Sequence, residues 1–422
     1  RMSDWKLHTP TGLADILPEE CEKKKNVENI INSVFVNMGY REIETPTFEY
    51  YDVFSGDSGQ ISQENMFKFF DEKGRILTLR PDITTSIARA AATKMKEEVL
   101  PIRLCYTGQV FRAEKTEGAR QREFTQSGIE LLGSDSPKAD AEVIAAAIEA
   151  IKAVGISDFQ VEIGQVAFFG GLAEQAGLSA ENIEKMRERI DCKDSLGIRE
   201  LTEKLNLAPE IKSIMAELPE LFGDLSVLER ADVAGLNTTS KNALENLRCI
   251  YGCLKEYGFE DYISIDLGML QSIDYYTGSI FKCYTHGVGF PVCAGGRYNN
   301  LAAKFGGDVS AVGVAFGINR ILSALRKSEK PRQKKGTAVI FAKKGFDGAA
   351  YRFAAEVRKA GFPCEIYLED YDIGNVGDYA GKKAAEYLVS VDENGAAAQN
   401  MQSADKRAVS CGDFIKMLKG DA

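Results

Sequence analysis

Around residue 120 the chain reads Phe111-Arg112-Ala113-Glu114, then a polar loop, then Arg122-Glu123-Phe124-Thr125-Gln126-Ser127-Gly128-Ile129-Glu130. Alternate residues of a strand share a face, so Arg122, Gln126 and Glu130 are expected on one face. Ile129 and Leu131 then lie on the other face. Charged side chains seldom gather on an enclosed sheet face unless they hold a small polar ligand. We therefore expect a strand that lines a binding site for a polar or zwitterionic molecule.

The bulk composition is that of an ordinary globular protein. The chain has 422 residues, of which 44% are hydrophobic and 27% are charged, and this length predicts two or three domains. No apolar run approaches the ~20 residues that span a bilayer. Residues 1–6 carry no apolar signal core, so we expect a cytoplasmic protein. The formal charge of −10 gives no overall basic footprint for a nucleic acid.

The cysteines and histidines argue against a metal site. Nine cysteines are scattered along the chain without a CxxC pair, which is atypical of a disulfide framework or a zinc ribbon. Cys249 and Cys253 are four residues apart, a spacing that suits two packed thiols on one helix face better than a metal site. Only His8 and His286 are present, which nearly excludes a histidine dyad or a histidine-rich metal cluster. We expect no metal and no cofactor.

Hydrophobic periodicity predicts an α+β core within residues 1–325. The expected helices cover residues 18–38, 84–95 and 138–154, and the expected strands cover residues 40–46, 66–70, 76–79, 102–112, 122–132, 158–163 and 262–283. Residues 170–255 have helical spacing and many Glu and Lys, which predicts a helical insertion. Several of the strands follow one another as hairpins, as in an antiparallel sheet.

The remaining residues predict a linker and a small domain. Residues 326–336 contain six basic residues and Pro331, which favours a solvated linker over a nucleic-acid contact. Residues 337–422 alternate short strands, at 337–342, 364–368 and 387–391, with helical segments. This pattern indicates a small α/β domain.

Five motifs, in this order, resemble the histidyl-tRNA synthetase-like branch of the class II synthetases. They are Gly39–Pro46, Leu79–Thr84, Phe111–Phe124, Asp274–Thr277 and Gly313–Arg320. The resemblance covers about residues 8–325 and implies an antiparallel sheet flanked by helices, with a dimer interface at the first motif. Residues 337–422 resemble a reduced anticodon-binding domain.

The resemblance implies a histidine pocket built from seven residues. They are Asp82 and Thr84 at the α-amino group, Gln126 and Glu130 completing the polar cage, Arg112 at the carboxylate or an ATP phosphate, and Tyr275 and Tyr276 around the imidazole. The residue types suit these roles, because an ammonium group binds carboxylates, a carboxylate binds a guanidinium and a ring packs on aromatic walls. Taken singly, Asp82 could instead cap the following helix, and the two tyrosines could be ordinary core.

Three departures from the synthetase pattern argue against catalysis. Gln271 stands where the resemblance places a catalytic arginine, and losing such a donor at developing charge costs roughly 10²–10³ in rate. Thr116-Glu117 replaces the usual Pro-Gln, and Asn319 replaces the glutamate that normally precedes Arg320. Arg112 and Arg320 are retained as remnants of nucleotide contacts. We therefore expect no catalytic residue.

The pattern is more similar to the synthetase paralogues that act as regulatory subunits of ATP phosphoribosyltransferase. The most similar segments are Arg120–Gln126, Asp274–Gly278 and Gly295–Leu301. The resemblance implies a subunit of the first step of histidine biosynthesis, with a short-form catalytic subunit as partner and L-histidine as feedback effector. It further implies a homodimer within a hetero-oligomer, with neither tRNA nor membrane as partner. The alternatives are a divergent histidyl-tRNA synthetase and a scaffold whose pocket stays empty.

The segment Gly295-Gly296-Arg297-Tyr298 has two interpretations. The glycines permit close approach of the backbone to a ligand or to another strand. In the first interpretation Arg297 contacts a ligand. In the second the glycines form a tight turn and Arg297 belongs to a salt bridge.

Overall fold

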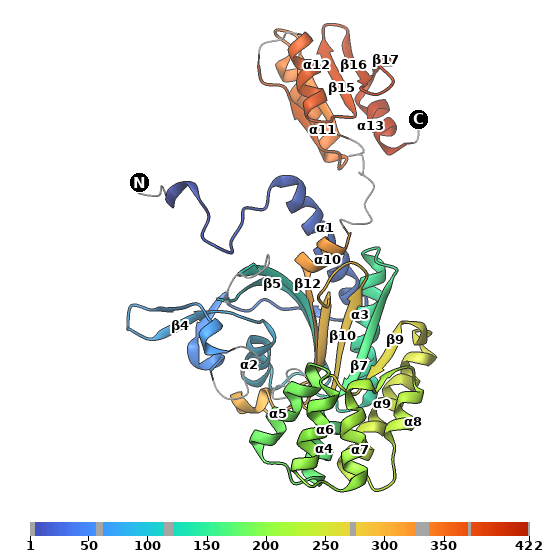
Figure 1. The fold of residues 1–422 in the computed structure, drawn as a ribbon. Helices are drawn as coiled ribbons and strands as arrows, with labels where there is room; N and C mark the ends of the chain where they lie inside the picture. The colour runs from blue at the N-terminus through green and yellow to red at the C-terminus, as the bar shows by residue number, and fades with distance from the viewer. Residues whose placement is uncertain are drawn as a thin grey trace. The chain divides into compact units, whose positions relative to one another are not determined.

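The computed structural model describes residues 5–55, 62–113, 121–270, 276–325, 337–369 and 373–420 (Figure 1). The chain divides into two compact units, Arg1–Ser328 and Glu329–Ala422. Tyr275 and Gln271 lie outside the described residues, as do Thr116, Glu117 and the 326–336 segment.

The first unit contains ten of the described α-helices and six short 3-10 helices. The α-helices are α1 (Pro18–Asn37), α2 (Thr84–Lys94), α3 (Pro137–Ala153), α4 (Val166–Gln175), α5 (Ala180–Asp191), α6 (Ser195–Lys204), α7 (Pro209–Glu217), α8 (Ser226–Ala231), α9 (Thr238–Glu256) and α10 (Ile318–Leu325). The 3-10 helices are η1 (Trp5–Leu7), η2 (Tyr51–Val53), η3 (Gln63–Asn65), η4 (Leu218–Glu220), η5 (Glu260–Tyr262) and η6 (Ala302–Phe305). Over the described residues, no helix combines the length and the apolar character that crossing a membrane requires.

A nine-stranded sheet forms the centre of this unit, in the order β1-β5-β6-β12-β11-β10-β7-β9-β8. Its strands are β1 (Arg41–Glu42), β5 (Ile102–Phe111), β6 (Glu123–Leu132), β7 (Phe159–Gln165), β8 (Phe222–Gly223), β9 (Ile263–Asp266), β10 (Ser279–Thr285), β11 (Cys293–Arg297) and β12 (Ala311–Gly317). The pairs β1–β5 and β7–β9 are parallel, and the other neighbouring pairs are antiparallel. The expected α+β class with an antiparallel sheet is therefore confirmed.

A second, smaller sheet contains β2 (Phe48–Tyr50), β4 (Ile76–Leu79) and β3 (Lys68–Phe70), in that order. The hairpin expected over residues 66–79 is its β3–β4 pair. The strand expected over 40–46 is shorter than predicted, because only Arg41 and Glu42 pair with β5.

Helices α1, α3 and α10 pack on one face of the large sheet. The main core lies between them and side chains such as Cys105, Ile129, Leu131, Val314 and Phe316. Ile129 and Leu131 thus face this core, as the strand alternation predicts. Part of the opposite face is covered by α2, whose Ile87 and Ala91 pack with Leu104, Tyr106 and Val110 of β5. The space beyond α2 on this face holds the site described below.

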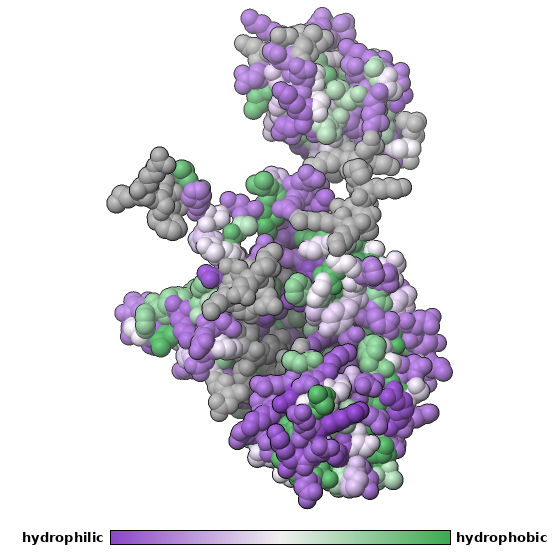
Figure 2. Space-filling view, in the orientation of Figure 1, coloured by the Kyte–Doolittle hydropathy of each residue, from purple (hydrophilic) through white to green (hydrophobic). Residues whose placement is uncertain are grey.

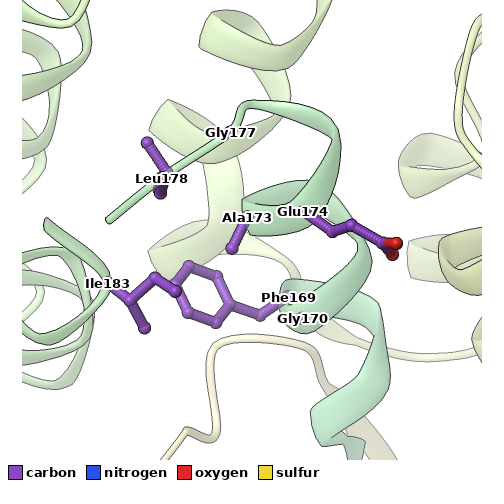
Figure 3. Close-up of a pocket in the computed structure, with 7 residues that line it drawn as sticks. All are labelled: Phe169, Gly170, Ala173, Glu174, Gly177, Leu178 and Ile183. Carbon is purple, nitrogen blue, oxygen red and sulfur yellow. The ribbon is translucent and has the colours of Figure 1, made fainter. Parts of the chain in front are cut away.

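The helical insertion runs from α4 to α9, slightly beyond the expected 170–255 at both ends. It is not wholly helical, because β8 pairs with β9 at the edge of the large sheet. A surface hollow of about 400 Å³ lies beside α4 and the start of α5. Figure 3 shows Phe169 and Ile183 pointing toward one another there, whereas Glu174 points away. This hollow is separate from the polar strand face that the sequence singles out.

The second unit is a five-stranded sheet in the order β14-β13-β15-β16-β17, with helices on both faces. Its elements are β13 (Ala338–Ala342), α11 (Asp347–Lys359), β14 (Cys364–Ile366), α12 (Ile373–Lys382), β15 (Tyr387–Asp392), β16 (Gly395–Asn400), β17 (Lys406–Val409) and α13 (Cys411–Lys419). The three expected strands, β13, β14 and β15, form the parallel part. The antiparallel strands β16 and β17 were not expected, because alanine, glutamine and lysine have low strand propensity.

A buried ion pair joins the last strands of the large sheet to α3. Arg297 donates from Nη2 to Asp140 Oδ2 at 2.6 Å and from Nε to Asp140 Oδ1 at 3.1 Å. Both side chains are buried, and the Ser279 hydroxyl also donates to Asp140. Arg297 is therefore a salt-bridge residue, and the second interpretation of that arginine holds.

We expect Asp140→Ala to lower the free energy of unfolding by ~3–5 kcal/mol, because the Arg297 guanidinium would stay buried without its carboxylate. Urea denaturation followed by circular dichroism measures this change. Glu203→Ala is the matched control, because its pair with Lys212 at 3.0 Å is exposed and such pairs contribute ~0–1 kcal/mol. An Asp140→Ala variant as stable as the control would show that the pair does not hold the sheet to α3.

Candidate ligand-binding site

The candidate site lies on the face of the large sheet that α2 partly covers. Glu130 of β6 pairs with Leu104 of β5 on one side and with Gly313 of β12 on the other. Gly313 in turn pairs with Gly296 of β11. Residues directly opposite in neighbouring strands share a face. The strand register therefore places the Glu130 carboxyl group beside two positions that have no side chain.

Glu130 is the most deeply buried carboxyl group of the site, with 1% of its surface exposed. Thr84 Oγ1 donates to Glu130 Oε1 at 2.6 Å, and the Tyr298 hydroxyl donates to Glu130 Oε2. Burial raises the pKa of Glu130 to about 8, and the nearby Asp82 adds to this rise. The hydroxyl donors lower the pKa but do not compensate for the lost water.

Asp82 is the second buried carboxyl group, and it precedes α2. Its Oδ1 accepts the backbone N–H of Thr85 at 2.7 Å, so it caps the helix, as its alternative role in the sequence predicts. Burial raises the pKa of Asp82, while Arg112 and Lys304 oppose that rise. Among the described residues, no lysine or arginine forms an ion pair with Asp82 or Glu130. Within the part of the chain that the structure describes, the two buried acids thus have no ion-pair partner.

Three glycines allow larger side chains of the site to pack closely against the backbone of the sheet. A Cβ atom added at Gly313 would lie 1.7 Å from Glu130 Oε2, and one at Gly128 would lie 2.5 Å from the Tyr106 hydroxyl. A Cβ at Gly296 would lie 2.8 Å from Tyr276 Cδ1. Real Cβ contacts are essentially never this short. We call Gly128, Gly296 and Gly313 the glycine floor of the site.

The remaining predicted residues are distributed unevenly. Gln126 shares the face of Glu130, because it is four residues away on the same strand. Arg112 donates from Nε to the Pro81 carbonyl at 3.2 Å and lies over the Phe124 ring, 5.2 Å from its centroid. Arg112 therefore lies beside the segment that carries Asp82.

The structure does not bring Arg320 to the buried acids. Its guanidinium donates to the Pro291 carbonyl at 2.8 Å and lies 5.6 Å from the centre of the Phe290 ring. Asn319 beside it donates to Gln121. Over the described ranges, no three His, Cys, Asp or Glu side chains gather in a way that could hold a metal ion.

Comparison with known proteins identifies the family of this chain. The histidyl-tRNA synthetase family model matches residues 12–321. The ATP phosphoribosyltransferase regulatory subunit of Acetivibrio thermocellus is 44% identical over 98% of this chain and all of that protein. This chain belongs to the family of ATP phosphoribosyltransferase regulatory subunits. The resemblance to these regulatory subunits that the sequence indicated is thereby confirmed.

Two solved structures resemble this chain. One, from Bacillus halodurans C, is described as an ATP phosphoribosyltransferase regulatory subunit/histidyl-tRNA synthetase. It has a TM-score of 0.79 at 32% identity, covering 88% of this chain and 96% of the other. The histidyl-tRNA synthetase from Nostoc sp. PCC 7120 has a TM-score of 0.83 at 22% identity, covering 98% and 99%. At 22% identity, the similarity to the Nostoc structure shows a shared fold alone.

Two tyrosine side chains of the site, Tyr106 and Tyr298, were not predicted from the sequence. Tyr298 donates directly to Glu130, and Tyr106 lies over the glycine floor. The segment Gly295–Tyr298 drew attention to Arg297, which lies on the opposite side of the strand and binds Asp140. Strand alternation could have identified Tyr298, because Gly296 and Tyr298 share one face while Arg297 points to the other.

We expect Gly313→Ala to lower the free energy of unfolding by ~1–3 kcal/mol, because the added methyl group overlaps Glu130. Calorimetric melting temperatures of the full chain measure this change. Gly170→Ala on α4 is the control, because nothing lies within 4 Å of a Cβ there, and alanine in a helix interior is favoured by ~0.5–1 kcal/mol. A Gly313→Ala protein that melts like Gly170→Ala would mean that the glycine floor is not closely packed.

Proposed function

We propose that this chain is a non-catalytic regulatory subunit that binds L-histidine in the Asp82–Glu130 site. It acts with a short-form catalytic ATP phosphoribosyltransferase in the first step of histidine biosynthesis, and bound histidine inhibits the complex. The observation that carries the proposal is a pair of buried acids, Asp82 and Glu130, with which no lysine or arginine among the described residues forms an ion pair. Buried carboxylates are normally paired, so this pair suits an ammonium group supplied by a ligand.

The surroundings of the two acids fit an amino acid. Thr84 and Gln126 offer neutral hydrogen-bonding groups beside the carboxyl groups, and Arg112 offers a guanidinium for a ligand carboxylate. Tyr276 is partly buried over Gly296 and provides an aromatic wall. We propose Tyr275 as a second wall from its sequence position alone.

Two features support a role without catalysis. Gln271 stands where the family resemblance expects a catalytic arginine, and Arg320 is engaged by Pro291 and Phe290. Residues 337–422 contain eleven basic and thirteen acidic residues, a balance that offers tRNA no net positive field. Histidine must then act by binding one state of the complex better than another, with a coupling of ~1–3 kcal/mol.

We expect Glu130→Ala to weaken histidine binding by ~2–5 kcal/mol, because the ligand's ammonium group would lose a buried carboxylate partner. Isothermal titration calorimetry of the full chain, alone and with its catalytic partner, measures this change. Arg320→Ala is the control and should bind histidine within about twofold of the unaltered chain, since Arg320 contacts other groups. Absence of histidine binding in every form would refute the proposed sensor.

A divergent histidyl-tRNA synthetase is the second candidate, because the synthetase family model covers residues 12–321. Pyrophosphate exchange that depends on both histidine and ATP distinguishes the two functions. We expect no exchange even at high protein concentration, whereas efficient exchange would establish the enzyme.

A further inference from the structure

The two buried acids of the site have unlike surroundings. Asp82 accepts a backbone N–H at the start of α2, and the charges of Arg112 and Lys304 reach it. Both influences favour its ionised form. Over the described residues, the side chains that donate hydrogen bonds to Glu130 are the hydroxyl groups of Thr84 and Tyr298, which carry no charge. Two close acids whose surroundings differ in this way divide the roles of charged and neutral group.

Among the described residues, the groups found to act on Glu130 are neutral or negatively charged. Helix α2 contributes Thr84, and the segment before it contributes the Asp82 carboxylate. Strand β5 contributes Tyr106, and Tyr276 and Tyr298 flank β10 and β11. Burial raises the pKa values of Tyr106 and Tyr276 as well, so these phenols stay neutral at physiological pH. Glu130 is 1% exposed and forms no ion pair with a described lysine or arginine, which disfavours its charged form. Burial accordingly raises the pKa of Glu130 to about 8, and we expect a neutral carboxyl group in the unliganded protein at pH 7.

We propose that an amino acid with a protonated amino group binds this site by displacing the proton of Glu130. The neutral carboxyl group loses its proton to solvent, and the resulting carboxylate accepts hydrogen bonds from the ligand's ammonium group. No bond other than the O–H bond of Glu130 is broken, and the positive charge of the ligand's ammonium group takes the place of the released proton beside Glu130. The inference rests on the proposed function and adds a regulatory property, namely that histidine sensing depends on pH.

The direction of the dependence follows from the raised pKa in the free state. Below about pH 8 the free site must release a proton to bind, so affinity falls as the pH falls. For a group with a free-state pKa of about 8 and a much lower pKa in the complex, affinity at pH 7 is roughly fivefold weaker than at pH 8. Feedback inhibition by a given histidine concentration is correspondingly weaker in more acidic conditions.

The test is isothermal titration calorimetry of histidine into the full chain at pH 7, in buffers with different enthalpies of ionisation. The slope of binding enthalpy against buffer enthalpy gives the number of protons released, for which we expect roughly 0.9. Glu130→Gln keeps the size and hydrogen-bonding capacity of the side chain but cannot ionise. It should bind histidine more weakly, release no proton and show the same affinity at pH 7 and pH 8.

Glu162→Gln is the matched control. Glu162 is a partly buried acid on β7 whose pKa is also raised by burial, and it does not belong to the site, so its variant should release the same number of protons as the unaltered chain. Binding of histidine without proton release would overturn this inference and leave the proposed function intact. Unchanged release in Glu130→Gln would overturn it too, because the proton would come from another group. Absence of histidine binding would refute both.

Discussion

The burial of Glu130 beside Asp82, without an ion pair to any lysine or arginine that the structure describes, is the constraint on which the site depends. An ionised carboxyl group away from water is costly unless it is paired, and the sheet provides only hydroxyl groups from Thr84 and Tyr298. Burial raises the pKa of Glu130, which favours the neutral carboxyl group and so lowers this cost in the free protein. The same arrangement gives the site its affinity for a positively charged group. Stability and recognition therefore make opposite demands on one side chain.

The two-residue period of a strand separates this ligand chemistry from structural chemistry. Arg297 and Tyr298 are adjacent in the chain but point to opposite faces of the sheet. Arg297 binds Asp140 of α3 and anchors the helical layer, whereas Tyr298 holds Glu130. A polar segment that looks like one functional motif in the sequence thus serves two separate networks, and only one of them reaches the site.

Much of the fold follows from sequence pattern. The α+β class, the β3–β4 and β5–β6 hairpins and the helices α1, α2 and α3 lie close to their expected positions, because apolar spacing and turn residues are local signals. Strands β8, β16 and β17 were missed, because pairing with neighbours rather than composition places them in sheets. At the site, Asp82, Thr84, Gln126 and Glu130 lie near α2 and β6 as expected. The hydrogen bond from Tyr298 to Glu130 and the contacts of Arg320 with Pro291 and Phe290 are tertiary interactions. No pattern in a single sequence predicts them. The assignment of histidine to this site remains a prediction.

The glycine floor has a consequence for how such a protein can change its preference for ligands. Any mutation at Gly128, Gly296 or Gly313 adds atoms where Tyr106, Tyr276 or Glu130 already lies, so each single substitution in the glycine floor is expected to lower stability. Adaptation to a differently shaped amino acid would have to proceed through the walls, at positions such as Gln126 and Tyr276. Directed evolution toward a new effector would therefore gain most from libraries confined to those walls, with all three glycines held fixed.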